Sequence, residues 1–333
     1  MTFRTVKRAG ACSVLLLVGI ALGAGGVTVF QKFGTKIYST DIREAVRSDT
    51  ILTSPLLECR ELSSSLSDET LATLREKSKA LMDKAQKAGD IIYASIYFRD
   101  LSNGPWFGLN EADEFFPASL LKLPLAMSFY GKAEDDPAIL SKEITYRPDP
   151  STAEQVQPFG PVRNVEAGKK YTIQALLDIM LQESSNESAV ALAEIAGQEQ
   201  ITSVYRDLGL TPPVFGQDYK IDTHKYASFF RILYNATYID RSSSEKILQS
   251  LTETSFKDGL VAGVPQGITL AHKFGSRQVD IKPNTVQLHD CGIIYVPNKP
   301  YILCVMTQGS DFTQLADFIK QESALVYKYV SAQ

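Results

Sequence analysis

The chain has few of the residues that build metal sites. Its 333 residues include three histidines and four cysteines. The histidines, His224, His272 and His289, stand far apart, and neither C-x-x-C nor H-E-x-x-H occurs. The sequence therefore predicts neither a metal site nor a cofactor, and the histidines are interpreted as isolated surface or core residues.

Two features that would indicate other functions are also missing. Lysine and arginine total 34 against 38 acidic residues, a formal net charge of −4, whereas nucleic-acid binding requires a basic face. The G-x-S-x-G elbow of Ser-His-Asp hydrolases does not occur. His289 and Asp290 are neighbours in a predicted strand, so their side chains point to opposite faces and cannot form a relay together. The sequence predicts no nucleic-acid partner and no Ser-His-Asp triad.

An uncharged stretch lies near the N-terminus. Arg4, Lys7 and Arg8 precede residues 9–30, which approach the roughly 20 apolar residues that span a bilayer as a helix. We therefore expect residues 1–30 to be a transmembrane helix with the lipid bilayer as its partner. A cleavable signal peptide is the alternative, because the stretch 21–24 supplies the small residues of a cleavage site. Either reading places the rest outside the cytoplasm, membrane-anchored at the cell surface or in the periplasm, or secreted after cleavage.

The remaining chain divides into a connecting segment and one domain. Residues 31–89 are interpreted as a stalk that ends in a first helix, with Ser67 or Asp68 at its N-cap. Residues 90–333 begin with two predicted strands, continue with helices and end with three strands and a helix, which is an α+β plan. The predicted strands are 91–99, 106–108, 268–274, 287–296 and 301–307, and the clearest predicted helices are 171–180, 188–196, 224–234 and 312–330. We expect one antiparallel five-stranded sheet flanked by helices, with a helical subdomain beside it.

Two cysteines flank a predicted hairpin turn. Cys291 and Cys304 lie on either side of a turn predicted at residues 297–300. Counted outward from that turn, the two residues are diagonal rather than opposite, so a disulfide is possible but not favoured. Cys304 is interpreted as a small hydrophobic residue packed in a strand.

A serine and a lysine stand three residues apart at the start of a predicted apolar helix. Ser119 and Lys122 therefore share one side of that helix. A serine needs a nearby base to become a nucleophile, and a lysine whose pKa is lowered by burial can serve. The same S-x-x-K spacing occurs at Ser243 and Lys246, but in a polar context typical of a helix cap. The apolar surroundings favour Ser119.

Two further patterns follow in the sequence. Ser184-Ser185-Asn186 comes after a predicted helix and offers a second hydroxyl and an amide, although helix capping is an alternative role. Lys273-Phe274-Gly275 ends a predicted strand, where a lysine can attract a carboxylate and a glycine allows close backbone approach. A solvated strand end is the alternative for Lys273.

In this order, the three patterns resemble the S-x-x-K, S-D-N and K-T-G motifs of the class A β-lactamase and penicillin-binding protein family. The resemblance extends from about residue 90 to the C-terminus and includes Phe116-Pro117-Ala118 ahead of Ser119. It implies acylation of Ser119 by β-lactams or D-alanyl peptides of the peptidoglycan stem. The roles that it implies are Ser119 as nucleophile, Lys122 as base, Ser184 as proton donor to the leaving nitrogen, Lys273 as carboxylate ligand, Asn186 as acyl-amide ligand, Gly275 as substrate contact, and the backbone N–H groups of Ser119 and Ser276 as oxyanion hole.

Three residues or segments depart from the family pattern. Ser185 replaces the aspartate of the second motif, and Phe274 replaces the hydroxyl residue of the third, for which Ser276 or Arg277 is a candidate substitute in substrate binding. The loop 211–219 contains no glutamate to activate a deacylating water; its only carboxylate is Asp218. We therefore expect slow hydrolysis of the acyl-enzyme. The alternative function is a non-catalytic cell-wall-binding or interaction domain on the same scaffold.

Overall fold

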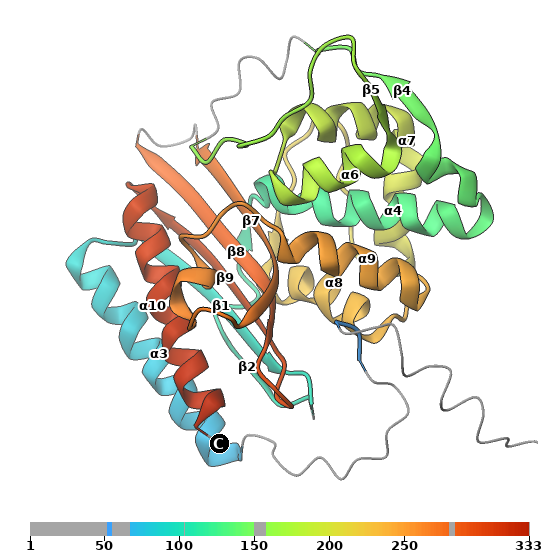
Figure 1. Cartoon of the computed structure of the whole chain (residues 1–333). Helices are drawn as coiled ribbons and strands as arrows, with labels where there is room; N and C mark the ends of the chain where they lie inside the picture. The colour runs from blue at the N-terminus through green and yellow to red at the C-terminus, as the bar shows by residue number, and fades with distance from the viewer. Residues whose placement is uncertain (1–51, 55–66, 103, 150–157, 280–283, 333) are drawn as a thin grey trace, which may run out of the picture. The chain divides into compact units, whose positions relative to one another are not determined.

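A five-stranded antiparallel sheet forms the centre of the domain (Figure 1). The computed structural model describes residues 52–54, 67–102, 104–149, 158–279 and 284–332. The strand order is β2-β1-β9-β8-β7, so that the two N-terminal strands pair with the three C-terminal ones, as expected. The strands are β1 (Tyr93–Asp100), β2 (Trp106–Leu109), β7 (Thr269–Val279), β8 (Thr285–Tyr295) and β9 (Tyr301–Gly309).

Helices cover both faces of this sheet (Figure 1). On one face lie α3 (Asp68–Ala88) and α10 (Phe312–Ser331), which pack against each other. On the other side stand the helices of the predicted helical subdomain, α4 (Lys122–Asp135), α6 (Ile173–Gln182), α7 (Asn186–Asp207), α8 (Thr223–Asn235) and α9 (Arg241–Thr252). The α+β plan is confirmed.

Short elements connect the main ones. Three 3₁₀ helices are described, η1 (Ala118–Leu121), η2 (Pro137–Ser141) and η3 (Leu260–Gly263). Two small strand pairs, which the sequence analysis did not predict, join β3 (Glu114–Phe115) to β6 (Ile221–Asp222) and β4 (Glu143–Thr145) to β5 (Lys170–Thr172). The β3–β6 pair joins the end of the loop 211–220 to the segment that leads to Ser119.

The expected membrane segment, residues 1–30, lies outside the described residues. Within the parts of the chain that the structure describes, no helix combines the length and the apolar character needed to cross a bilayer. Most of the expected stalk also lies outside the described residues. Its last part is α3, which Ser67 caps by accepting a hydrogen bond from the Thr70 amide.

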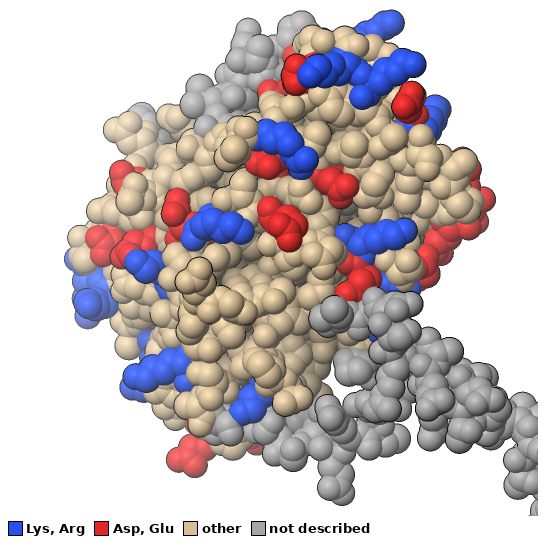
Figure 2. All heavy atoms as spheres, viewed as in Figure 1, with Lys and Arg blue, Asp and Glu red and all other residues tan. Residues whose placement is uncertain are grey.

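Two apolar cores hold the layers together, one on each face of the sheet. The alternation of side chains along each strand sends one set toward α3 and α10 and the other toward the helical subdomain. In α10, apolar residues recur three and four positions apart and face the sheet, among them Leu315, Phe318, Ile319 and Val326. On the surface shown in Figure 2, acidic and basic side chains are interspersed rather than separated by sign.

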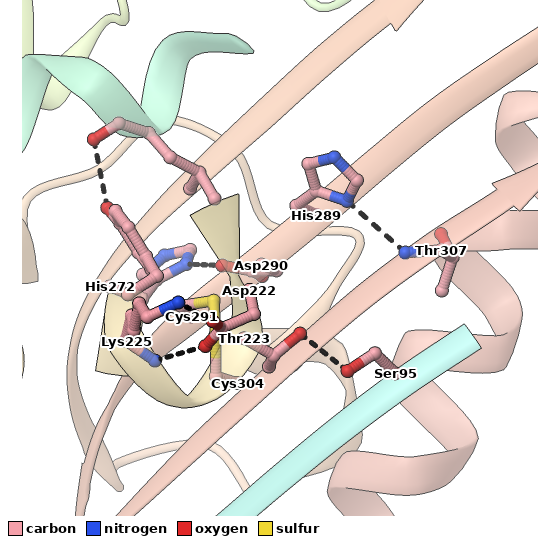
Figure 3. Close-up of a disulfide and its surroundings, with 12 residues drawn as sticks. Ser95, Asp222, Thr223, Lys225, His272, His289, Asp290, Cys291, Cys304 and Thr307 are labelled. Carbon is pink, nitrogen blue, oxygen red and sulfur yellow. Dashed lines mark hydrogen bonds and ion pairs between the residues drawn. A yellow bond between two sulfur atoms is a disulfide. The ribbon is translucent and has the colours of Figure 1, made fainter. Parts of the chain in front are cut away.

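The disfavoured disulfide is present, which corrects the sequence analysis. Cys291 and Cys304 are directly opposite in the β8–β9 ladder and are covalently bonded, against α8 (Figure 3). The turn begins one residue earlier than predicted, because the Lys299 amide donates to the Val296 carbonyl (2.9 Å). Pro297 then occupies the second turn position and Asn298 the third with φ 61°, as a type II turn prefers. This one-residue change moves every cross-strand pair by two positions and brings the sulfur atoms together.

A carboxylic acid is buried between α3 and α10. Glu322 is 0% exposed, its Oε1 accepts a hydrogen bond from Ser78 Oγ (2.6 Å), and no partner for its Oε2 is found among the described residues. Burial raises the pKa of Glu322 from 4.5 to about 7. The folded protein therefore holds this proton more tightly than the unfolded chain does. The resulting stabilisation is complete below pH 4.5 and is lost as the pH rises to about 7.

Replacing Glu322 by glutamine is expected to remove this pH dependence. Relative to the wild type, the unfolding free energy of Glu322→Gln should gain about 3 kcal/mol between pH 4.5 and pH 8, since one pKa unit corresponds to about 1.4 kcal/mol. Urea unfolding curves across this range measure the difference. Asp317→Asn, on the exposed side of α10, is the matched control and should give a constant difference. Parallel pH profiles for wild type and Glu322→Gln would contradict the assignment.

Candidate active site

Ser119 lies in the tight turn that opens α4. The 3₁₀ helix η1 carries Ser119 and passes directly into α4 at Lys122. Ala118, the residue before it, has φ 48°, a left-handed conformation that is unfavourable for a side chain with a Cβ. Lys122 Nζ donates to Ser119 Oγ at 3.0 Å, so the predicted pair is in contact.

Lys122 is enclosed by polar groups of the second motif. Its Nζ bonds Asn186 Oδ1 (2.7 Å) and Ser184 Oγ (3.3 Å), and it also bonds the Ser184 carbonyl. Burial, and next the charge of Lys273, hold the pKa of Lys122 well below its usual value, while Glu187 acts in the opposite direction. A lysine with a lowered pKa has a neutral amine available to accept the Ser119 proton.

The second motif both caps a helix and lines the site. Ser185 is the N-cap of α7 and accepts a hydrogen bond from the Ser188 amide (3.0 Å), so capping is correct for this residue. Ser184 and Asn186 instead turn their side chains toward Lys122. Ser184 has φ 56°, the second non-glycine residue of the site in the left-handed region. Such strained backbone concentrates at functional sites, where the surrounding structure holds it in place.

Lys273 completes the group from β7. It is 0% exposed, and its Nζ donates to Ser184 Oγ (2.9 Å) and to the Phe274 carbonyl (3.0 Å). Burial lowers the pKa of Lys273 to about 7. The Ser184 hydroxyl therefore lies between two lysine amines. The structure brings together four residues that the sequence placed in three separate patterns: Ser119, Lys122, Ser184 and Lys273.

Gly275 lets the Ser119 turn pack against β7. A Cβ at this position would lie 2.7 Å from the Pro117 carbonyl oxygen and 3.2 Å from atoms of Leu120. The sequence analysis expected this glycine to admit substrate, and the structure adds a packing reason of its own. Close contact at Gly275 also keeps the backbone of the next residue, Ser276, near the turn that carries Ser119.

Arg277 contacts the segment that precedes Ser119. Its guanidinium lies 4.3 Å from the centre of the Phe116 ring, and Nη2 is 3.6 Å from Asp218 Oδ1. Lys220 Nζ lies 4.9 Å from the same ring. The loop 211–219, whose only carboxylate is Asp218, thus approaches the site at Phe116, ahead of Ser119 in the chain.

Two further residues of the site lie outside the three sequence motifs. Buried His289, interpreted as isolated, bonds the Phe116 carbonyl through Nε2 (3.0 Å) and accepts the Thr307 amide at Nδ1 (3.2 Å; Figure 3). Burial lowers the pKa of His289 to about 4, so the neutral ring fixes the segment before Ser119. Glu187, one residue beyond the second motif, has its Oε2 3.2 Å from Ser185 Oγ and acts electrostatically on Lys122. Its position in the first turn after the motif was the available signal.

Comparison with known proteins identifies the family of this chain. The family model described as "Beta-lactamase enzyme family" matches residues 73–330. Comparison with curated proteins finds no match.

Solved structures share the fold. PBP-A is 19% identical with a TM-score of 0.66, covering 79% of this chain and 97% of that one. A mutant of PBP-A, solved as an acyl-enzyme complex with penicillin G, is 19% identical with a TM-score of 0.65, covering 79% and 98%. A β-lactamase from Chitinophaga pinensis is 18% identical with a TM-score of 0.67, covering 78% and 100%. The family match spans nearly the whole described domain, so the chain belongs to the β-lactamase enzyme family of serine hydrolases.

Proposed function

We propose that this protein is an acyl-transfer enzyme in which β-lactams or D-alanyl peptides acylate Ser119. The contact of buried Lys122 with Ser119 Oγ at 3.0 Å carries the proposal, because a serine becomes nucleophilic only beside a base. The acyl-enzyme complex of the PBP-A mutant with penicillin G supports this substrate class.

The contacts support a balanced proton path for acylation. Ser119 Oγ attacks the substrate carbonyl carbon and gives its proton to neutral Lys122 Nζ. As the carbon–nitrogen bond breaks, Ser184 donates its proton to the leaving nitrogen and takes one back from Lys122 across 3.3 Å. The products are the Ser119 ester and a free amine, or the opened ring of a β-lactam. Lys122 ends neutral and Ser184 ends protonated, so both are ready for another turnover.

Backbone and side-chain donors account for substrate binding. The N–H groups of Ser119 and Ser276 stabilise the oxyanion of the tetrahedral intermediate, as electrostatic stabilisation at this position demands. Asn186, which also holds Lys122, offers its amide N–H₂ to the acyl-side carbonyl of the substrate. Gly275 and Arg277 border the substrate on the β7 side.

The protein acts outside the cytoplasm, anchored to the membrane by residues 1–30 or released by cleavage after them. The uncharged stretch 9–30 motivates this part of the proposal. The Cys291–Cys304 disulfide adds support, because disulfides persist chiefly in oxidising compartments. Fractionation of cells that produce the full chain, followed by N-terminal sequencing, distinguishes an anchored from a cleaved protein. Recovery of the intact chain in the cytosol would contradict both.

Intact-protein mass spectrometry tests the proposed reaction. After exposure to penicillin G, the protein is expected to gain the mass of one penicillin molecule. Ser119→Ala should gain none, whereas Ser243→Ala, in the other S-x-x-K pattern, should react as the wild type does. A folded wild-type protein that forms no adduct would favour the non-catalytic cell-wall-binding alternative.

A further inference from the structure

The amine of Lys273 has three contacts within the protein. It donates to Ser184 Oγ (2.9 Å) and the Phe274 carbonyl (3.0 Å). On a third side the Phe274 ring lies 4.4 Å from Nζ, within the range of a cation–π contact. Lys273 is therefore engaged before any substrate carboxylate arrives.

The ring of Phe274 belongs to a cluster of four phenylalanines. Phe274 is 2% exposed and stacks on Phe256 with ring centres 4.4 Å apart. Phe159 meets both rings edge-on, at 4.9 Å from Phe256 and 6.1 Å from Phe274, and Phe312 at the start of α10 packs on Phe159 at 5.8 Å. We call Phe159, Phe256, Phe274 and Phe312 the phenylalanine wall. Phe274 is the member of this wall that contacts Lys273.

Phe159 is held in this wall through the second motif. Its segment continues to Val162, whose amide donates to Glu183 Oε2 (3.2 Å), and to Arg163, which donates to Gln182 Oε1 (2.8 Å). Ser185 Oγ then donates to Asn164 Oδ1 (2.7 Å). Ser185 and Phe274, the two residues that depart from the family motifs, are therefore connected through the same segment. Ser185 fixes the segment that carries Phe159, and Phe159 packs on Phe274.

Contact with these aromatic rings does not stabilise an anion. The faces of aromatic rings carry the negative end of the ring quadrupole, so they attract cations and not carboxylates. Arg277, the half-buried cation of β7, is directed to the Phe116 ring and Asp218 instead. The surroundings of Lys273 at Phe274 are consequently apolar.

β-Lactams and D-alanyl peptides carry a carboxylate on their leaving group. We propose that the phenylalanine wall makes this enzyme select substrates in which an uncharged, apolar group takes the place of that carboxylate. This inference rests on the proposed acylation of Ser119 and names its substrate class. Lys273 then positions the Ser184 proton, and Phe274 and Phe159 determine specificity. Penicillins still react, but their carboxylate contributes little to the rate.

Two matched thioesters test the selectivity. Both carry the same N-acyl-D-alanyl group; one releases thioglycolate, with a free carboxylate, and the other releases its methyl ester. Attack by Ser119 forms the oxygen–carbon bond and breaks the carbon–sulfur bond, so release of the free thiol reports acylation directly. For the wild type, kcat/KM for the carboxylate should not exceed kcat/KM for the methyl ester.

Variants of the wall separate this inference from a general structural effect. Phe274→Thr should raise the carboxylate-to-ester ratio of kcat/KM at least tenfold, whereas Phe274→Leu, apolar and without a hydroxyl, should keep the wild-type ratio. Phe159→Ala opens the wall without altering β7 and should also raise the ratio. A wild-type preference for the carboxylate, or equal shifts for Phe274→Thr and Phe274→Leu, would overturn the inference.

The same reagents test the proposed acylation of Ser119 separately from the selectivity. Intact mass after each thioester and after penicillin G shows whether Ser119 is acylated at all, with Ser119→Ala as the control. An adduct together with a preference for the carboxylate would overturn the selectivity and leave the acylation standing. No adduct with any of the three reagents would overturn both.

Discussion

Lys122→Ala is expected to slow acylation of Ser119 by at least roughly 10²–10⁴-fold, the usual contribution of a general base. The loss should approach that of Ser119→Ala, because a nucleophile and its base act as a unit and their effects are not additive. In the structure Lys122 Nζ touches Ser119 Oγ (3.0 Å) and Asn186 Oδ1 (2.7 Å), so its removal also frees the amide that the substrate uses. Rapid-quench mass spectrometry of the penicillin adduct measures the rate.

The pH dependence of acylation identifies the same lysine. Lys122 must be neutral to take the serine proton, and burial holds its pKa well below the usual 10.5. Acylation in the wild type should therefore rise with pH and level off below the range of an ordinary lysine. Lys246→Ala, at the exposed lysine of the other S-x-x-K pattern, is the matched control and should change neither rate nor profile. Normal acylation of folded Lys122→Ala at neutral pH would exclude Lys122 as the base.

The second large effect is expected in deacylation. Hydrolysis of the Ser119 ester needs a positioned water and a base within hydrogen-bond reach, and the base contributes typically 10²–10⁴-fold. The loop 211–219 supplies no glutamate, and its one carboxylate, Asp218, is exposed and 3.6 Å from Arg277. We therefore expect acylation to outrun deacylation, so that a penicillin adduct persists on Ser119 for minutes or longer.

Stopped-flow mixing with a chromogenic cephalosporin measures this balance. A burst of one equivalent followed by a slow phase is the expected result. Asp218→Asn should leave the slow phase unchanged if Asp218 only pairs with Arg277. Glu187→Gln is the companion variant, because Glu187 is the carboxylate that acts on Lys122. A tenfold slower phase in either variant would identify a deacylating base, and linear turnover without a burst would refute the expected trapping.

The phenylalanine wall and the loop 211–219 are expected to affect different steps of the reaction, acylation and deacylation respectively. The phenylalanine wall contacts Lys273, whose amine bonds Ser184, and in the proposed reaction these two residues serve the leaving group during acylation. Asp218 and Arg277 lie at Phe116, on the side of Ser119 that faces the loop 211–219. Substitutions in the wall should therefore change which substrates acylate Ser119, and substitutions in the loop should change how long the ester persists.

The sequence by itself determined the plan of the domain and the members of the reactive group. Strand alternation and helical spacing are local properties, so they are visible in consecutive residues such as those of α10. The three motifs are also local, and Ser119, Lys122, Ser184 and Lys273 were each identified from their immediate neighbours. Their order along the chain already resembles the motif order of the family.

Only the tertiary structure decided the contacts between distant segments. His289 reaches Phe116 across 173 positions, and Phe159 joins Phe274 in a wall that no single stretch of sequence contains. The disulfide depended on a turn that begins at Val296, where a shift of one residue changes which strand positions face each other. Such contacts are set by register and by packing between layers. Both depend on the whole core at once, and a short run of residues does not record them.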